Sequence, residues 1–310
     1  MYKRQHPESW IIAIVWILIG FVIYKFYTSK QEIEHNAPLV FTQGPKLRKE
    51  YRIMVVFDKR NATKFYHIAK SISKLNNGEI TILNIINVPR QTPLSLSHGF
   101  GDKGLKAIED FKRLVPGSLR NRFLIRLAHD PTEAILSTAE EQDINIMLVD
   151  FSFLRNNRKL LSLTTCDIVG IKLKKNFDED MSQMVVSYDK GRHSDLGLEI
   201  GYAISIKNNS NIRIVRGVVE DPDDEVEVVN RINEKMLDLN LKKIQFEKVY
   251  SSGNIIPELL KNFKKDKSAL LVLGAGNQSE SAFSPKTLEI VDNTNTVSYT
   301  HLTLPTILLV

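Results

Sequence analysis

Arg52-Ile-Met-Val-Val-Phe-Asp58-Lys59 occurs a second time, in altered form, as Gln183-Met-Val-Val-Ser-Tyr-Asp189-Lys190. Each stretch is an apolar run that ends in an aspartate. A helical pattern follows each of them, over residues 62–75 in the first copy and 194–206 in the second. Another β-rich run comes after each helix. The two copies lie about 130 residues apart, which predicts two repeats of one structural unit.

Strands that alternate with helices imply parallel βαβ units. Short buried runs such as Ile146–Val149 are apolar without alternation, which is typical of strands covered on both faces. In the first copy we predict strands at 52–57, 79–87, 121–128, 145–149 and 167–173, and helices at 62–75, 104–114 and 131–142. The second copy is predicted to run similarly from residue 183, with a helix over 224–238 and a strand at 244–250. The predicted fold class is therefore α/β, with two doubly wound parallel sheets.

A transmembrane helix is predicted before the first repeat. No charge interrupts Trp10–Tyr24, and the apolar stretch through Tyr27 is about 27 Å long as a helix, close to the hydrocarbon core of about 30 Å. Basic residues follow this segment, so the positive-inside rule places its C-terminal side in the cytosol. We predict a membrane helix over 6–27 and a polar linker over 28–50. A signal peptide and a buried core helix are the alternatives.

Composition excludes several functional classes. The formal charge of +6 is spread along the chain without an aromatic-studded basic stripe, so nucleic acid is not a predicted partner. The single cysteine, Cys166, cannot form an internal disulfide and fits a reducing compartment. The seven histidines show no metal-ligand spacing. No Walker loop or Ser/His/Asp motif is present, so we predict neither an enzyme nor a metal site.

The order of these parts resembles the universal stress protein family across residues 51–296. The resemblance rests on the strand that ends in aspartate, on the helix before the fourth strand, and on Thr165-Cys166-Asp167-Ile168-Val169 at the entry to the fifth. It implies two Rossmann-like domains, at 51–175 and 176–296. Domains of this family dimerise through the fifth strand, so the resemblance also implies a pseudo-dimer between domains 1 and 2.

ATP-binding members of that family use an acid after strand one and a glycine loop, Gly-x-x-Gly-x9-Gly-Ser/Thr, after strand four. In the first copy Asp58 is present, but Asp150 follows strand four where phosphate would approach, so we expect no ATP there. In the second copy the candidate nucleotide-binding residues are Asp189, Gly274, Gly276 and Ser279, although their spacing departs from the family's pattern. A plain strand-to-loop turn is the alternative. We therefore predict no cofactor, with ATP in domain 2 as the other hypothesis.

Both ends of the chain look foreign to it. Residues 1–5 and 297–310 resemble translated sequencing adapter, so we expect the second domain to lack its fifth strand. Residues 6–27 look similar to the last membrane helix of amino acid–polyamine–organocation permeases, some of which carry such a tandem as a cytosolic tail.

These resemblances imply a fragment of a membrane amino acid transporter that carries tandem regulatory or interaction domains. Its expected partners are the missing transport core of the same polypeptide and the lipid bilayer. The expected location is the cell membrane, with the C-terminal domains in the cytoplasm. The alternative is a membrane-anchored, nucleotide-sensing pair of universal stress protein domains that binds ATP or a related ligand in domain 2.

Overall fold

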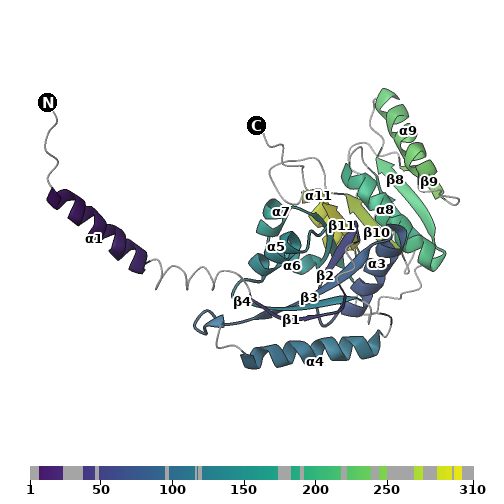
Figure 1. Ribbon diagram of the computed structural model, residues 1–310. Helices are drawn as coiled ribbons and strands as arrows, with labels where there is room; N and C mark the ends of the chain where they lie inside the picture. Colours follow the sequence, from purple (N-terminus) through teal and green to yellow (C-terminus); the bar gives the residue numbers. More distant parts are fainter. Residues whose placement is uncertain are drawn as a thin grey trace, which may run out of the picture.

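The protein is built on a mixed β-sheet with helices on both faces, as the computed structural model in Figure 1 shows. The structure describes residues 7–23, 38–45, 49–94, 98–115, 117, 121–173, 183–188, 192–217, 222–238, 244–249, 269–274, 285–294 and 297–301. Within these residues the strands of both repeats join one continuous sheet.

The strands of the first repeat are parallel, as the sequence predicts. They are β2 (Arg52–Val56), β3 (Glu79–Asn87), β4 (Arg122–Ala128), β5 (Ile146–Asp150) and β6 (Asp167–Lys172). The chain adds β3 and then β4 on one side of β2, and returns to add β5 and β6 on the other side. This is a doubly wound topology, in which the winding direction reverses beside β2.

Helices cover both faces of this part of the sheet. They are α3 (Ala62–Leu75), α4 (His98–Leu114), α5 (Pro131–Glu141), α6 (Phe151–Asn156) and α7 (Lys159–Leu163). Side chains of α3 and α4 share one apolar cluster with Ile53, whereas those of α5, α6 and α7 share another with Met54. The side chains of neighbouring strand residues therefore point to opposite faces of the sheet, as expected for a pleated strand.

One strand lies inside the predicted polar linker 28–50. β1 (Leu39–Gln43) pairs antiparallel with β4 at the edge of the sheet. Pro38 precedes this strand and Gly44 follows it. Gly44 has φ +97°, and a Cβ atom there would lie 2.2 Å from the carbonyl oxygen of Asn121. Glycine therefore suits the point where this edge strand turns away from the sheet.

The second repeat continues the same sheet. Its elements include β7 (Gln183–Ser187), α8 (Arg192–Asn208), β8 (Asn211–Gly217), α9 (Pro222–Asp238), β9 (Ile244–Val249), β10 (Ala269–Gly274) and α11 (Pro285–Asn293). The described strands are parallel, with β10, β7, β8 and β9 side by side. α8 packs against α3 of the first repeat, and side chains of both helices belong to one apolar cluster.

A further strand, β11 (Val297–His301), connects the two repeats. It runs parallel to β10 and antiparallel to β6, so the full order is β1-β4-β3-β2-β5-β6-β11-β10-β7-β8-β9. We expected this fifth-strand position to be missing, because residues 297–310 resemble adapter. The structure instead places a strand there. Val-Ser-Tyr-Thr is rich in β-branched and aromatic residues, which favour pairing with an open sheet edge.

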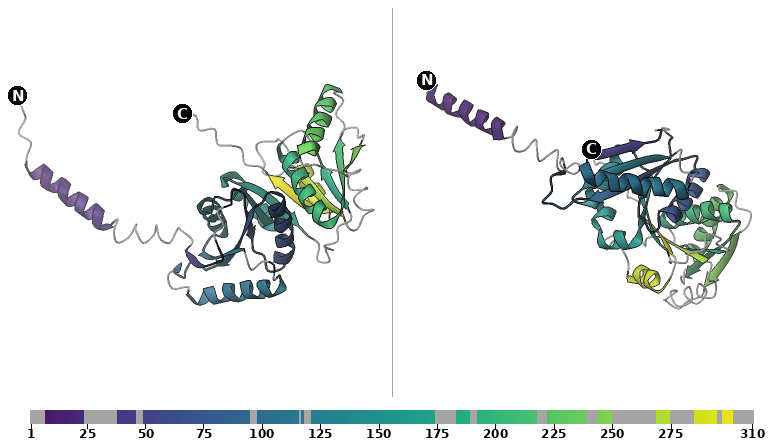
Figure 2. Two further views of the ribbon diagram at one scale, coloured as in Figure 1. Left: turned by 45° about the vertical axis from the view of Figure 1, so that its right-hand side comes forward. Right: turned by 90° about the horizontal axis from the view of Figure 1, so that it is seen from below.

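The segment predicted as a transmembrane helix over 6–27 contains α1 (Pro7–Ile23), a helix of 17 residues. No helix within the described residues is both long enough and apolar enough to cross a membrane. α1 lies clear of the sheet in Figure 1 and in both views of Figure 2. Each residue from Ile12 to Val22 is exposed, including Trp16 at 68% and Ile17 at 70%.

Cys166 is buried at the entry to β6, where its thiol lies 3.4 Å from the hydroxyl of Thr164. Burial raises the pKa of the Cys166 thiol from 9.0 to about 11. Because the folded state holds this proton more tightly, the resulting stabilisation is complete below pH 9 and is lost as the pH rises towards 11. We expect the ionisation of Cys166 to lower the free energy of unfolding by about 2 kcal/mol between pH 8 and pH 10.5.

Urea titrations at these two pH values measure this loss. Buried tyrosines also ionise at high pH, so the relevant comparison is with a Cys166→Ala variant. Between these two pH values the free energy of unfolding of Cys166→Ala should fall by about 2 kcal/mol less than that of the unaltered protein. An identical pH dependence in both proteins would contradict the prediction.

Candidate functional site

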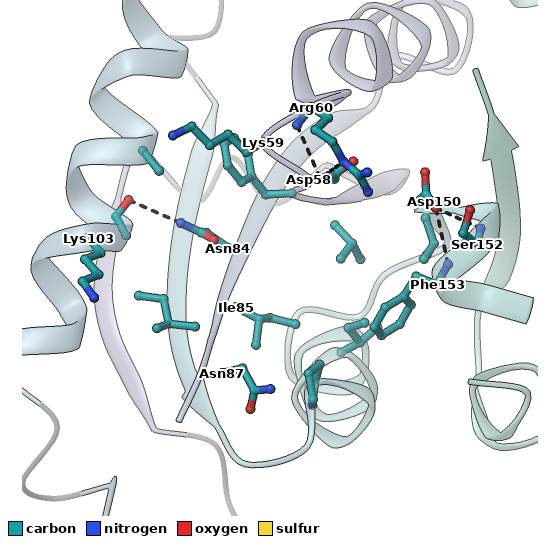
Figure 3. Close-up of a pocket in the computed structure, with 18 of the residues that line it drawn as sticks. Asp58, Lys59, Arg60, Asn84, Ile85, Asn87, Lys103, Asp150, Ser152 and Phe153 are labelled. Carbon is teal, nitrogen blue, oxygen red and sulfur yellow. Dashed lines mark hydrogen bonds and ion pairs between the residues drawn. The ribbon is translucent and has the colours of Figure 1, made fainter. Parts of the chain in front are cut away.

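A cavity of about 640 Å³ opens at the carboxyl ends of β2, β3 and β5 (Figure 3). Gly104 and Ala107 of α4 line one side, and residues at the starts of α5 and α6 line the other. The cavity lies where the winding of the sheet reverses, which is the usual ligand position in open α/β sheets. Its volume falls within the range of about 300–1,000 Å³ found for small-molecule sites.

Asp58 follows β2 at the edge of this cavity and organises the turn into α3. Its backbone oxygen accepts hydrogen bonds from the amides of Asn61 and Ala62, at 3.0 and 2.8 Å. Its carboxylate accepts a hydrogen bond from the side-chain amide of Asn61 at 3.3 Å and lies 3.6 Å from Arg60 Nε. The Arg60 side chain is 84% exposed, so solvent screens this ion pair.

Asp150 ends β5 at the same edge of the cavity as Asp58. Its Oδ1 accepts hydrogen bonds from the backbone amides of Ser152 and Phe153, at 2.9 and 3.3 Å, and so caps α6. Its Oδ2 lies 3.5 Å from the side-chain nitrogen of Asn61, the same nitrogen that contacts Asp58. The structure therefore brings together the two acids that the sequence places after strands one and four.

Asn84 lies in the wall of the cavity, on β3, and its residue is only 7% exposed. Its side-chain nitrogen donates to the carbonyl oxygen of Gly104 at 3.3 Å. A Cβ atom on Gly104 would lie 2.6 Å from the side chain of Ile86 and 3.0 Å from that of Ile125. The missing side chain thus lets α4 approach the sheet closely enough to form this wall.

The rest of the lining divides into an apolar interior and a polar rim. Val149 and Ile135 are buried beside Ile85 and Phe153. Lys59, Arg60, Asn87, Lys103, Ser152 and Asn156 also line the cavity and are exposed. The interior can hold an apolar body, while polar groups gather near solvent.

The nucleotide site predicted in the second repeat falls largely outside the described residues, where Asp189, Gly276 and Ser279 lie. Gly274 is described and ends β10. A Cβ atom there would lie 3.0 Å from the backbone nitrogen of Ser194 and 3.1 Å from the carbonyl carbon of His193. Because these are backbone atoms of α8, close packing of strand and helix accounts for glycine at this position.

Sequence reasoning missed a polar network in the second repeat, in which Tyr188 and Asp195 are buried and Arg231 is partly exposed. The Tyr188 hydroxyl donates to Asp195 Oδ1 at 2.5 Å, and Arg231 donates to Asp195 Oδ2 from Nε at 3.2 Å and from Nη2 at 2.5 Å. Burial raises the pKa of Tyr188, and the Asp195 carboxylate raises the pKa of Arg231. These residues come from the end of β7, α8 and α9, so no local sequence pattern links them. Their contacts hold α8 and α9 together.

Comparison with known proteins identifies the fold alone. No protein-family model and no curated protein matches the chain. A universal stress protein from Archaeoglobus fulgidus is a similar solved structure, with a TM-score of 0.54 and 15% identity over 80% of this chain and 97% of its own. A putative universal stress protein from Pseudomonas aeruginosa gives 0.52 and 12%, over 80% and 92%.

The cytoplasmic domain of a prokaryotic cation chloride cotransporter is also similar. Its TM-score is 0.55 and its identity is 9%, over 81% of this chain and 95% of that domain. At such low identities the shared feature is the arrangement of strands and helices. The chain therefore has an α/β fold like that of universal stress protein domains.

Proposed function

We propose that this chain is part of a membrane transporter, in which two universal stress protein-like units on the cytosolic side regulate or help to assemble the transport core. The observation that carries this proposal is α1. A helix that is apolar all round is normally buried in a large protein or in a membrane, yet the residues from Ile12 to Val22 are exposed here. A lipid bilayer or the other helices of a transport core would cover them.

The comparisons supply a second line of support. A solved structure with the same arrangement of elements is itself the cytoplasmic domain of a transporter, although its low identity shows only the fold. In our proposal the parent transports amino acids, as the resemblance of residues 6–27 to a permease helix suggests, and the two repeats act as a pseudo-dimer. They are a regulatory module, neither an enzyme nor dependent on a cofactor.

Flotation with lipid vesicles tests the membrane role of α1. We expect the full chain to float with phosphatidylcholine vesicles in a density gradient, and an Ile14→Asp/Leu18→Asp variant to remain at the bottom. An aspartate at the centre of a membrane helix costs about 3 kcal/mol, so two should reduce vesicle binding by more than a hundredfold.

The matched control is an Ile14→Leu/Leu18→Ile variant, which keeps the helix apolar and should float. Flotation of the aspartate variant would contradict a membrane role for α1. Long-read sequencing of the source DNA tests the transporter assignment separately, because we expect several hydrophobic helices encoded upstream in the same reading frame.

A further inference from the structure

The turn between α3 and β3 contains the one Asn-Gly dipeptide of the sequence, Asn77-Gly78. A peptide nitrogen can attack the side-chain carbonyl carbon of the asparagine before it. Glycine hinders this attack least, because it has no Cβ atom and its backbone rotates freely. Asn77 is exposed, so water has access to its side chain. By its sequence and its exposure, this dipeptide is the most reactive asparagine position of the chain.

The fold accounts for both residues of the dipeptide. Asn77 follows the C-cap of α3 with φ +47°, in the left-handed region where asparagine is favoured over most other side chains. A Cβ atom on Gly78 would lie 2.8 Å from the carbonyl oxygen of Tyr51, which is closer than a real Cβ atom can approach. The end of α3 therefore brings the two members of this reactive pair together for structural reasons.

We propose that Asn77 deamidates spontaneously in this protein, independently of any membrane role of α1. The peptide nitrogen of Gly78 forms a bond to Cγ of Asn77, and the bond between Cγ and Nδ2 breaks. The peptide proton leaves with the amide group as ammonia, and a succinimide ring remains. Water then adds to either carbonyl group of the ring, which gives aspartate or its isomer isoaspartate. The reaction consumes water and needs no oxidant or reductant.

The native hydrogen bonds of the turn oppose this reaction. The amide of Gly78 donates to the carbonyl oxygen of Ser73 at 2.8 Å, and the hydroxyl of Ser73 donates to the carbonyl oxygen of Gly78 at 2.9 Å. The peptide nitrogen must leave its hydrogen bond before it can reach Cγ of Asn77. Because helix ends open at a low cost in free energy, the reaction proceeds in the folded protein through opening of the last turn of α3.

Lys49 provides a partner for the aspartate product. Its Nζ atom donates to Oδ1 of Asn77 at 2.8 Å. Aspartate tolerates the left-handed conformation as asparagine does, so the turn would keep its shape while Lys49 exchanges a neutral acceptor for a charged one. Isoaspartate differs, because it lengthens the main chain by one methylene group next to the closely packed Gly78. The aspartate form therefore retains the fold, whereas the isoaspartate form loosens the start of β3.

The second repeat provides a matched comparison within the same chain. Asn209-Ser210 lies at the end of α8 as Asn77-Gly78 lies at the end of α3. Asn209 is exposed with φ +52°, and the amide of Ser210 donates to the carbonyl oxygen of Ser205 at 3.0 Å. The two turns differ at the attacking nitrogen, which the side chain of Ser210 hinders. Asn209 should therefore deamidate much more slowly than Asn77.

Peptide mass spectrometry of aged protein tests this inference. The full chain is kept in neutral detergent at mildly alkaline pH, digested, and compared with unaged protein at each asparagine. We expect Asn77 to convert first, to a mixture of aspartate and isoaspartate, while Asn209 remains an amide. In guanidinium chloride the Gly78 amide no longer binds Ser73, so Asn77 should react at least about fivefold faster, the factor that one hydrogen bond represents.

Two variants complete the test. Ser210→Gly gives the second repeat the same dipeptide and should raise the deamidation rate of Asn209 towards that of Asn77. Asn77→Asp reproduces the aspartate product and should unfold at the same urea concentration as the unaltered protein, or at a higher one. The inference is overturned if Asn77 converts no faster than Asn209 in protein with a native circular dichroism spectrum, or if Ser210→Gly leaves Asn209 unreactive. A lower unfolding midpoint for Asn77→Asp would overturn the proposed place of the product beside Lys49.

Discussion

Replacing Arg231 by methionine should lower the free energy of unfolding by about 2–4 kcal/mol. Asp195 is only 8% exposed, and Arg231 supplies two of the three donors that satisfy its carboxylate. Methionine fills similar space but has no N–H group, so the charge of Asp195 would remain buried with the Tyr188 hydroxyl as its main partner. Urea unfolding of the full chain in neutral detergent measures the loss.

Two further variants test the reason for this loss. Lys235→Met breaks the neighbouring contact with Glu199, which is 2.9 Å long, but both side chains are about one-third exposed and the cost should stay below about 1 kcal/mol. An Asp195→Leu/Arg231→Met double variant should be more stable than Arg231→Met alone, since it no longer leaves a charge buried. Equal losses for Arg231→Met and Lys235→Met would contradict a special role for Asp195.

The core of the first repeat could be predicted from sequence because its patterns are local. The helix predicted at 62–75 and the strand predicted at 79–87 agree with α3 and β3 at both ends. Apolar residues at helical spacing indicated the helix, and a short apolar run indicated the strand. By contrast, α4 begins at His98 and not at 104, because Gly99 and Gly101 weaken the helical pattern in its first turns.

Two strands, β1 at the edge of the sheet and β11 between the repeats, could not be predicted, because their partner strands are distant in sequence. β1 lies in the predicted linker and is held by β4, and β11 lies in residues that resemble adapter and is held by β10 and β6. A strand of five residues is too short to show a clear pattern of alternating or continuous apolar residues in the sequence. Its existence depends on an open edge that only the folded sheet provides.

The candidate site was predictable in part. Asp58 and Asp150 stand out in the sequence because each follows an apolar strand, and carboxyl ends of neighbouring parallel strands meet at one edge. Asn84 gave no such signal, because an amide within a strand comes to line a cavity wall only where a helix such as α4 packs beside it, here at Gly104. The sequence attached the nucleotide hypothesis to the second repeat, whereas the cavity described here belongs to the first.

Glu141→Ala should also destabilise the protein by about 2–4 kcal/mol. Arg126 lies on β4, and its side chain is only 3% exposed, whereas its ion-pair partner Glu141 reaches it from the last turn of α5. Without Glu141 the guanidinium charge would stay in a position with little access to water. Urea unfolding of the full chain in neutral detergent measures this effect too.

The adjacent residue provides the matched control. Glu140 is exposed in the same helical turn, as Glu141 is, so Glu140→Ala removes the same charge and the same side chain but leaves the Arg126–Glu141 ion pair intact. Its cost should stay within about 0.5 kcal/mol. Glu141→Gln keeps a hydrogen-bond acceptor for Arg126, so its free energy of unfolding should lie between those of Glu141→Ala and Glu140→Ala. If all three variants were equally stable, Arg126 would be neutralised by its other contacts, and α5 would be held to β4 by apolar packing alone.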